Sequence, residues 1–216
     1  MKESLARLLP KPLRSDAVTI PVVRLQGAIM SGGSPMRQHL SLATTAGLLD
    51  KAFAFPAPAL AISLNSPGGS PVQSRLIYRR IRDLAEEKKR TVLVFVEDVA
   101  ASGGYMIALA GDEIIADPSS IVGSIGVVSA GFGFQEMIKK VGVERRVYTS
   151  GRNKVILDPF QPEKPEDIER LKTLQEEVHQ GFIALVKERR GAKLADDDEL
   201  FTGLFWTGER GRALGL

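Results

Sequence analysis

The feature that most constrains the fold is a regular alternation of short apolar runs with segments of helical periodicity. Four apolar runs bounded by turn residues are predicted as strands: 18–29, 60–66, 91–97 and 113–117. Between them, apolar residues recur at helical spacing, which predicts helices over 40–53, 71–88 and 102–110. Strands that alternate with helices in this way are typical of an α/β fold with a largely parallel sheet.

The last third of the chain is predicted to be mainly helical. A helix over 134–141 and a strand over 144–150 lead into the loop GRNKVILDPF. The longest helix is predicted over 165–190, because its apolar residues form one stripe. A final short helix is expected to follow Thr207, which can cap it.

Linker-like composition is confined to DPFQPEKPED, at residues 158–167. This stretch is predicted to separate a catalytic core from a C-terminal helical arm. The resulting division is a tail over 1–17, an α/β core over 18–160 and an arm over 161–216.

The first signal of function is the junction LNSPGGSP at residues 64–71, where a buried strand turns into a helix. Gly68 and Gly69 allow positive φ angles and leave amide N–H groups pointing outward near a helix N-terminus. Such donors suit a developing oxyanion. Taken alone, a Pro-Gly-Gly sequence is more often an ordinary tight turn.

The second signal is VEDVAASGGY at residues 96–105, which places Ser102 at the entrance of a helix. A serine in this place is most often an N-terminal cap. The two junctions together are more specific, because both bring small residues and free amides to the same ends of parallel strands, where α/β sheets hold their sites. Ser102 is therefore a candidate nucleophile.

A nucleophilic serine needs a proton acceptor, and the chain contains two histidines, His39 and His179. His39 lies in or beside a polar loop, and His179 is more simply explained as a partly buried structural residue. A lysine can replace histidine where desolvation lowers the lysine pKa toward neutrality. A shift of ~3 units corresponds to about 4 kcal/mol. Lys154 is the best candidate, since the aliphatic residues that follow it could exclude water, although most lysines are solvated.

Composition excludes several classes of protein. The chain has no cysteine, which excludes disulfides and thiolate metal sites, and no metal or cofactor is predicted. Its net charge of +3 is spread along the chain and fits solvated helix faces better than nucleic-acid binding. Residues 1–14 lack the apolar run of ~7–15 residues that a signal peptide needs. A cytoplasmic location is expected, with weak peripheral contact between residues 1–14 and a membrane as the alternative.

Four motifs occur in order between Val18 and Leu216: NSPGG, AASGGY, GSIGV, and a glycine-containing loop with a lysine before DPF. This order and spacing resemble the signal peptide peptidase A (protease IV) family of serine peptidases, which shares the spiral fold of the Clp protease and crotonase superfamily. The resemblance implies a Clp/crotonase-like spiral of β-β-α units with a C-terminal helical arm.

The resemblance also implies a serine endopeptidase that uses a Ser-Lys dyad. Ser102 would be the nucleophile, Lys154 the general base, and Ser124 of GSIGV would orient the lysine. Expected substrates are extended peptides with small or apolar residues at the cleavage site, including signal peptide remnants.

The oxyanion hole would be formed by the backbone amides of Gly69 and Gly103, with Gly68 shaping the turn. The family implies homo-oligomeric rings or domes, in which the arm over 161–216 would make contacts and the lysine could come from a neighbouring protomer. The sequence departs from the family in two places. It shows no membrane anchor, and it stops at ALGL, where relatives continue with a further short motif and strand.

Two other functions stay open at this point. A crotonase-type acyl-CoA enzyme also uses paired glycine amides as an oxyanion hole, but the lysine loop would then be unexplained. A catalytically silent oligomeric scaffold would use Ser102 as a helix cap alone.

Overall fold

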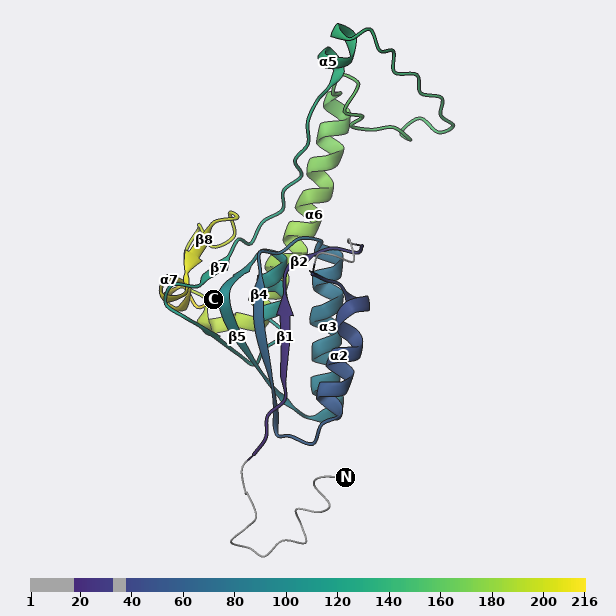
Figure 1. The fold of residues 1–216 in the computed structure, drawn as a ribbon. Helices are drawn as coiled ribbons and strands as arrows, with labels where there is room; N and C mark the ends of the chain where they lie inside the picture. Colours follow the sequence, from purple (N-terminus) through teal and green to yellow (C-terminus); the bar gives the residue numbers. More distant parts are fainter. Residues whose placement is uncertain (1–17, 33–37) are drawn as a thin grey trace, which may run out of the picture.

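The computed structural model describes residues 18–32 and 38–216 (Figure 1). The predicted tail over 1–17 therefore lies outside the described residues, as do residues 33–37. The strands are β1 (Val22–Gln26), β2 (Ala28–Ile29), β3 (His39–Leu40), β4 (Ala59–Ser66), β5 (Thr91–Ala101), β6 (Glu113–Ala116), β7 (Ile121–Gly123) and β8 (Phe205–Thr207). The helices are α2 (Leu42–Ala54), α3 (Pro71–Lys88), α4 (Gly103–Ala108), α5 (Gln135–Lys140), α6 (Pro165–Arg190) and α7 (Gly208–Ala213), with a 3₁₀ turn η2 (Gly191–Lys193) after α6.

The central sheet confirms the predicted α/β class. Its strands follow the order β1-β4-β5-β7-β8, and β6 pairs with β5 beside this path. All of these pairs are parallel except β7 with β8. A separate pair, β2 with β3, continues from β1. Parallel pairing follows from the helical crossovers between strands, as the alternating sequence predicts.

The core lies between the sheet and helices α2 and α3, which cover one of its faces (Figure 1). Ile62 and Leu64 on β4 and Ile77 and Ile81 on α3 are fully buried within it. Helix α3 begins where predicted, because Ser70 accepts a hydrogen bond from the N–H of Gln73 and Pro71 occupies the first turn.

Strand β5 is longer than predicted and carries the chain directly to the candidate serine. Its first half pairs with β6, and its second half, from Val99 to Ala101, pairs with β7. β7 and β8 have three residues each and were not predicted, because so short a run carries too few residues to show a pattern.

The strand predicted over 144–150 is wrong: these residues form no strand in the structure. They belong to a projection, made of residues 129–164 and the N-terminal half of α6, that extends away from the body (Figure 1). An extended segment needs a neighbouring strand to satisfy its backbone, and the sheet lies in the body. The boundary predicted near residue 160 stays a prediction.

Helix α6 connects the projection to the body. Its 26 residues give a length of about 39 Å. Phe182, Leu185 and Val186, in its C-terminal half, are buried in the core, whereas Leu174 and Val178 of the predicted stripe are exposed. Among the described residues, no helix is long and apolar enough to cross a membrane.

Candidate active site

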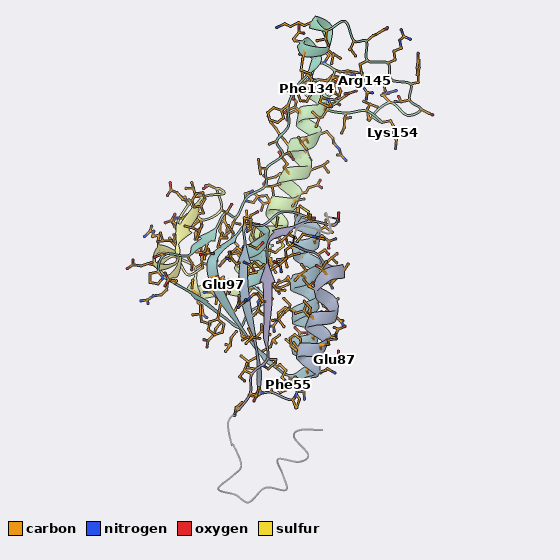
Figure 2. The ribbon with its side chains drawn as sticks, in the orientation of Figure 1. Phe55, Glu87, Glu97, Phe134, Arg145 and Lys154 are labelled. Atoms are coloured by element: carbon orange, nitrogen blue, oxygen red, sulfur yellow. The ribbon has the colours of Figure 1, made fainter. Side chains whose placement is uncertain are left out.

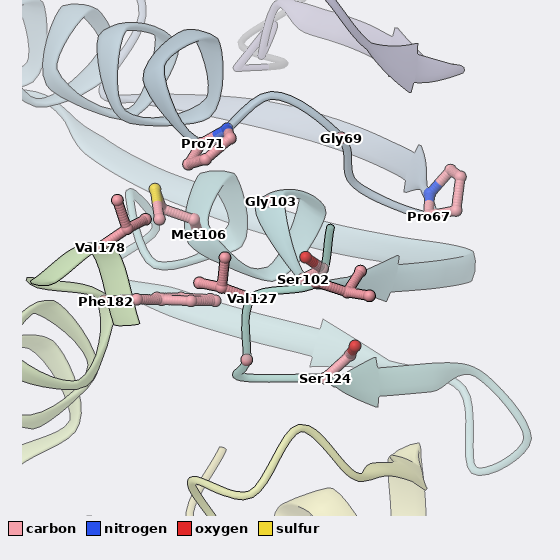
Figure 3. Close-up of a pocket in the computed structure, with 12 residues that line it drawn as sticks. Pro67, Gly69, Pro71, Ser102, Gly103, Met106, Ser124, Val127, Val178 and Phe182 are labelled. Carbon is pink, nitrogen blue, oxygen red and sulfur yellow. The ribbon is translucent and has the colours of Figure 1, made fainter. Parts of the chain in front are cut away.

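A cavity of about 460 Å³ lies where β4, β5 and β7 end. This is the edge of a parallel sheet at which α/β proteins hold their ligands. Figure 3 shows the residues of its wall, which come from the two predicted junctions, the segment after β7 and helix α6. They are Pro67, Gly69, Pro71, Ser102, Gly103, Met106, Ser124, Gly126, Val127, Val128, Val178 and Phe182.

Ser102 occupies a sharp turn between β5 and α4. Its φ of 52° and ψ of −123° are strained for a residue with a side chain, and its N–H donates to the carbonyl of Gly123 at 2.8 Å. The hydroxyl makes no capping hydrogen bond to α4. The structure therefore contradicts the reading of Ser102 as an N-terminal cap. A strained strand-to-helix turn that presents to a cavity a hydroxyl with no hydrogen-bond partner among the described residues suits a nucleophile.

The amides of Gly69 and Gly103 lie side by side next to this serine. A Cβ added to Gly103 would lie 3.4 Å from the nitrogen of Gly69. The turn around Gly69 is fixed by Ile29, which donates to the carbonyl of Gly68 and accepts from the N–H of Ser70, both at 2.8 Å. Among the described residues, neither glycine amide has an acceptor, so both N–H groups are free to bind an oxyanion.

Gly68 is required by close packing of the two junctions. Its φ is +100°, and a Cβ there would approach the carbonyl of Ala101 and the nitrogen of Gly103 at 2.8 Å. Gly69 has a φ of +141°, and a Cβ there would collide with the carbonyl of Ile29. The Pro-Gly-Gly sequence is therefore more than an ordinary turn, since it allows the turn to contact the backbone around Ser102.

Ser124 reaches the same cavity from the segment after β7. Its φ is +55°, and its N–H donates to the carbonyl of Leu204 at 2.7 Å. In Figure 3 its side chain lies on the same side of the cavity as Ser102. The next residue, Ile125, is buried, and its carbonyl lies 3.0 Å from Nε2 of His179. His179 thus has the structural role predicted for it, and it ties α6 to the wall of the site.

Lys154 does not lie in this cavity. It is exposed at the far end of the projection (Figure 2), and the aliphatic neighbours that were expected to exclude water leave it solvated in a single chain. The described residues of the wall include two hydroxyl side chains but no Asp, Glu, His, Lys or Arg. Ser102, Ser124 and the glycine amides are therefore brought together, and a base is not.

Helix α6 contributes residues that sequence reasoning missed. Val178 and Phe182 line the cavity together with Met106 and Val127, and these side chains make this part of the wall apolar (Figure 3). The apolar stripe of α6 was visible in the sequence, but its contact with a site some 80 residues earlier was not.

Polar chemistry near the cavity is otherwise sparse. Tyr105, on α4 behind Ser102, is fully buried, and burial raises its pKa above the ordinary value. Within 18–32 and 38–216, no three side chains of His, Asp or Glu are grouped so that they could hold a metal ion.

Comparisons with known proteins match these features. The model of Peptidase family S49 matches residues 84–216, a stretch that contains Ser102, Ser124 and Lys154. A putative protease of Methanocaldococcus jannaschii, MJ0651, is 35% identical over 71% of this chain and 49% of its own length. The chloroplastic serine protease SPPA of Arabidopsis thaliana is 34% identical over 72% of this chain and 23% of its own length.

A Brucella melitensis protein named Na(+)/H(+) antiporter NhaA is 72% identical over 98% of this chain. The chain spans 29% of that protein, so the name belongs to a much longer molecule than the matched part. The chain likewise spans about half or less of the two proteases above. The family match and the protease relatives agree with the motifs and the cavity: the chain belongs to peptidase family S49, the signal peptide peptidase A (protease IV) family of serine peptidases.

Proposed function

We propose that this chain is a serine endopeptidase domain in which Ser102 is the nucleophile and Lys154 of a neighbouring copy is the general base. One observation carries the proposal. Among the described residues, the cavity holds a strained serine hydroxyl and two glycine amides without partners but no base, while the candidate lysine stands exposed on a projection that extends from the same molecule (Figure 2). A second copy could supply the missing group without any change in the body.

The proposed reaction begins when Ser102 Oγ attacks the carbonyl carbon of a peptide bond. Nζ of a neutral Lys154 takes the hydroxyl proton, and the amides of Gly69 and Gly103 stabilise the negative oxygen of the tetrahedral intermediate. The lysine then returns the proton to the leaving amine, and an acyl-enzyme forms. Water activated by the same lysine hydrolyses this ester and regenerates Ser102. Ser124 would orient the amine by a hydrogen bond.

The proposed substrates are extended peptides with a small or apolar side chain at the cleavage site, such as remnants of signal peptides. The apolar wall formed by Met106, Val127 and Phe182 supports this preference. A buried apolar side chain gains about 25 cal/mol per Å² removed from water, whereas a charged one would lose its hydration.

Assembly into a ring or dome would follow from the same contact. A heterologous contact that repeats around an axis closes a ring in which every cavity receives one lysine. The projection exposes large apolar side chains that a partner could cover: Phe132, Met137, Val141, Val143 and Tyr148. We further propose the Clp/crotonase-like spiral for the β-β-α units. A cytoplasmic location and the lack of a nucleic-acid partner stay predictions.

The test is complementation between two inactive variants. Ser102→Ala and Lys154→Ala should each abolish cleavage of an apolar fluorogenic peptide. When the two variants are co-expressed in equal amounts, about one quarter of the cavities pair an intact serine with an intact lysine, so about a quarter of wild-type activity should return. Lys140→Ala, a lysine on the same projection, serves as the control and should keep full activity.

Each result has a clear reading. Full activity in either single variant would refute the assigned residue. Two inactive variants that fail to complement although they co-assemble would show that the dyad forms within one chain. Saturable binding of coenzyme A by the wild-type chain would revive the acyl-CoA alternative, which would also use the paired glycine amides but leaves the lysine loop unexplained.

A further inference from the structure

We infer that Asp158 and Arg145 form a clamp that positions Lys154, so that both are positioning residues for the peptidase reaction. The inference rests on the proposed function, because it concerns how the base is presented to the serine of another copy. Asp158 closes the loop that carries Lys154, and Arg145 stands at the start of that loop. The projection exposes most of its residues, which makes a buried carboxylate there unusual.

Asp158 is more buried than its partner. Its side chain is 4% exposed, against 47% for Arg145. One carboxylate oxygen accepts the N–H of Phe160 at 3.0 Å, and the other accepts Nε of Arg145 at 3.4 Å. A buried charge is retained at a cost unless it is paired and hydrogen-bonded, and here both oxygens have partners. The carboxylate therefore fixes the backbone after the loop to the residue before it.

Aromatic packing extends the clamp to the start of α5. The Phe160 ring lies 5.6 Å from the Phe134 ring, and the Arg145 guanidinium lies 5.8 Å from the centre of Phe160. The N–H of Phe134 donates to the carbonyl of Pro159 at 2.6 Å. Both ends of the loop are thus held against one small cluster, and Figure 2 labels two of its members, Phe134 and Arg145, close together on the projection.

The loop between these ends has little support of its own. Among its residues, 146–157, the structure shows one backbone hydrogen bond, from the N–H of Lys154 to the carbonyl of Gly151 at 3.2 Å. Leu157 has a φ of 53°, a conformation that is unfavourable for leucine and persists because its neighbour is held. The position of Lys154 therefore depends on where the clamp holds the two ends.

The first test is the Asp158→Ala variant. A base displaced by about 1 Å can cost on the order of 100-fold in rate. We expect kcat to fall by about 10- to 100-fold with KM unchanged, since the cavity that binds the substrate is intact. Asp158→Asn keeps an acceptor for the N–H of Phe160 but loses the charge facing Arg145, so its kcat should be intermediate. Glu144→Gln is the matched control, because Glu144 forms an exposed ion pair with Arg146 at the same end of the loop.

The decisive readout is the complementation group. Co-expression of Asp158→Ala with Ser102→Ala should restore activity to the same extent as co-expression of Lys154→Ala with Ser102→Ala. In both pairs the Ser102→Ala chain supplies a well-placed lysine. Co-expression of Asp158→Ala with Lys154→Ala should restore none. A substitution that damages the fold in general would not restore activity with one partner and fail with the other. Sedimentation is the control that checks whether each variant assembles.

Three results would overturn the clamp. They are full activity of both Asp158 variants, rescue of Asp158→Ala by Lys154→Ala, or a rise in KM with unchanged kcat. If Asp158→Ala does not assemble, the Asn variant decides by the same pairings. If Ser102→Ala and Lys154→Ala restore activity together but Asp158→Ala and Ser102→Ala do not, the clamp is rejected and the proposed function stands. Failure of that first pair, although the two variants co-assemble, would reject a neighbouring copy as the source of the lysine, and the kcat of the Asp158 variants alone would then decide whether the clamp exists.

Discussion

At the scale of residues, the two glycines that follow the candidate nucleophile, Gly103 and Gly104, leave no room for a Cβ for different reasons. A Cβ on Gly104 would collide with the backbone carbonyl of Ser66, whereas a Cβ on Gly103 would collide with the hydroxyl of Ser74. A backbone oxygen in a strand cannot move away. A serine hydroxyl can rotate, and it then loses its 2.8 Å hydrogen bond to the carbonyl of Ser70.

We therefore expect Gly104→Ala to lower the free energy of unfolding by about 1–3 kcal/mol through overpacking. Gly103→Ala should lower it by about 1 kcal/mol or less, the value of one hydrogen bond. Urea unfolding of both variants measures the difference, and Ser74→Ala combined with Gly103→Ala is the control that removes the obstacle. Equal losses in the two single variants would contradict this account.

The residues of the site were only partly predictable. Ser102 and the glycine amides could be found because their local sequence fixes a turn, and the structure brings them to one cavity. The surroundings of Lys154 could not be predicted, because aliphatic residues next to it in the sequence exclude water only if the fold, or another chain, closes over them. The catalytic roles of Ser102, the glycine amides and Lys154 stay proposals.

At the scale of elements, α6 contains a glycine that the helix does not need for space. Gly181 lies in the half of α6 that packs on the body, and a Cβ there would meet only Arg75, at an ordinary contact distance of 3.8 Å. Glycine within a helix is less stable than alanine by roughly 0.5–1 kcal/mol. Gly181→Ala should raise the free energy of unfolding by this amount and leave peptidase activity unchanged.

The matched control is Gly47→Ala in α2, where an added Cβ has no neighbour within 4 Å. Thermal unfolding should show a similar gain for both variants. A loss for Gly181→Ala together with a gain for Gly47→Ala would mean that α6 does not keep a regular helical backbone at this point.

Long elements were predictable because many residues repeat the same pattern. Helices α3 and α6 have the predicted bounds, and β4 and β5 lie where apolar runs placed them. The error at 144–150 has a physical cause, since β propensity describes a residue in a sheet and this segment has no strand beside it. The prediction missed β7 for the opposite reason, because its three residues form a strand only where β5 pairs with them.

At the scale of the whole molecule, the alternating sequence was enough to predict an α/β body, but not the projection. Nothing in the local pattern of residues 129–164 distinguishes a segment that packs on its own body from one that extends beyond it. The difference is visible in burial, because the large apolar side chains of the projection are exposed: Phe132 at 80% and Tyr148 at 90%. An exposed apolar surface of this kind is what the proposed contact with a neighbouring copy would cover.

The last prediction concerns that contact. If the projection joins neighbouring copies, Phe132→Asp should weaken assembly, because a carboxylate would have to be buried without a partner. Sedimentation velocity should show smaller species, and peptide cleavage should fall in parallel, since each separated cavity loses its lysine. Leu48→Asp is the control, because Leu48 is 52% exposed on α2 in the body. Should Phe132→Asp remain assembled and active, the contact would not depend on Phe132; should it dissociate and keep full activity, the lysine would have to reach Ser102 within its own chain.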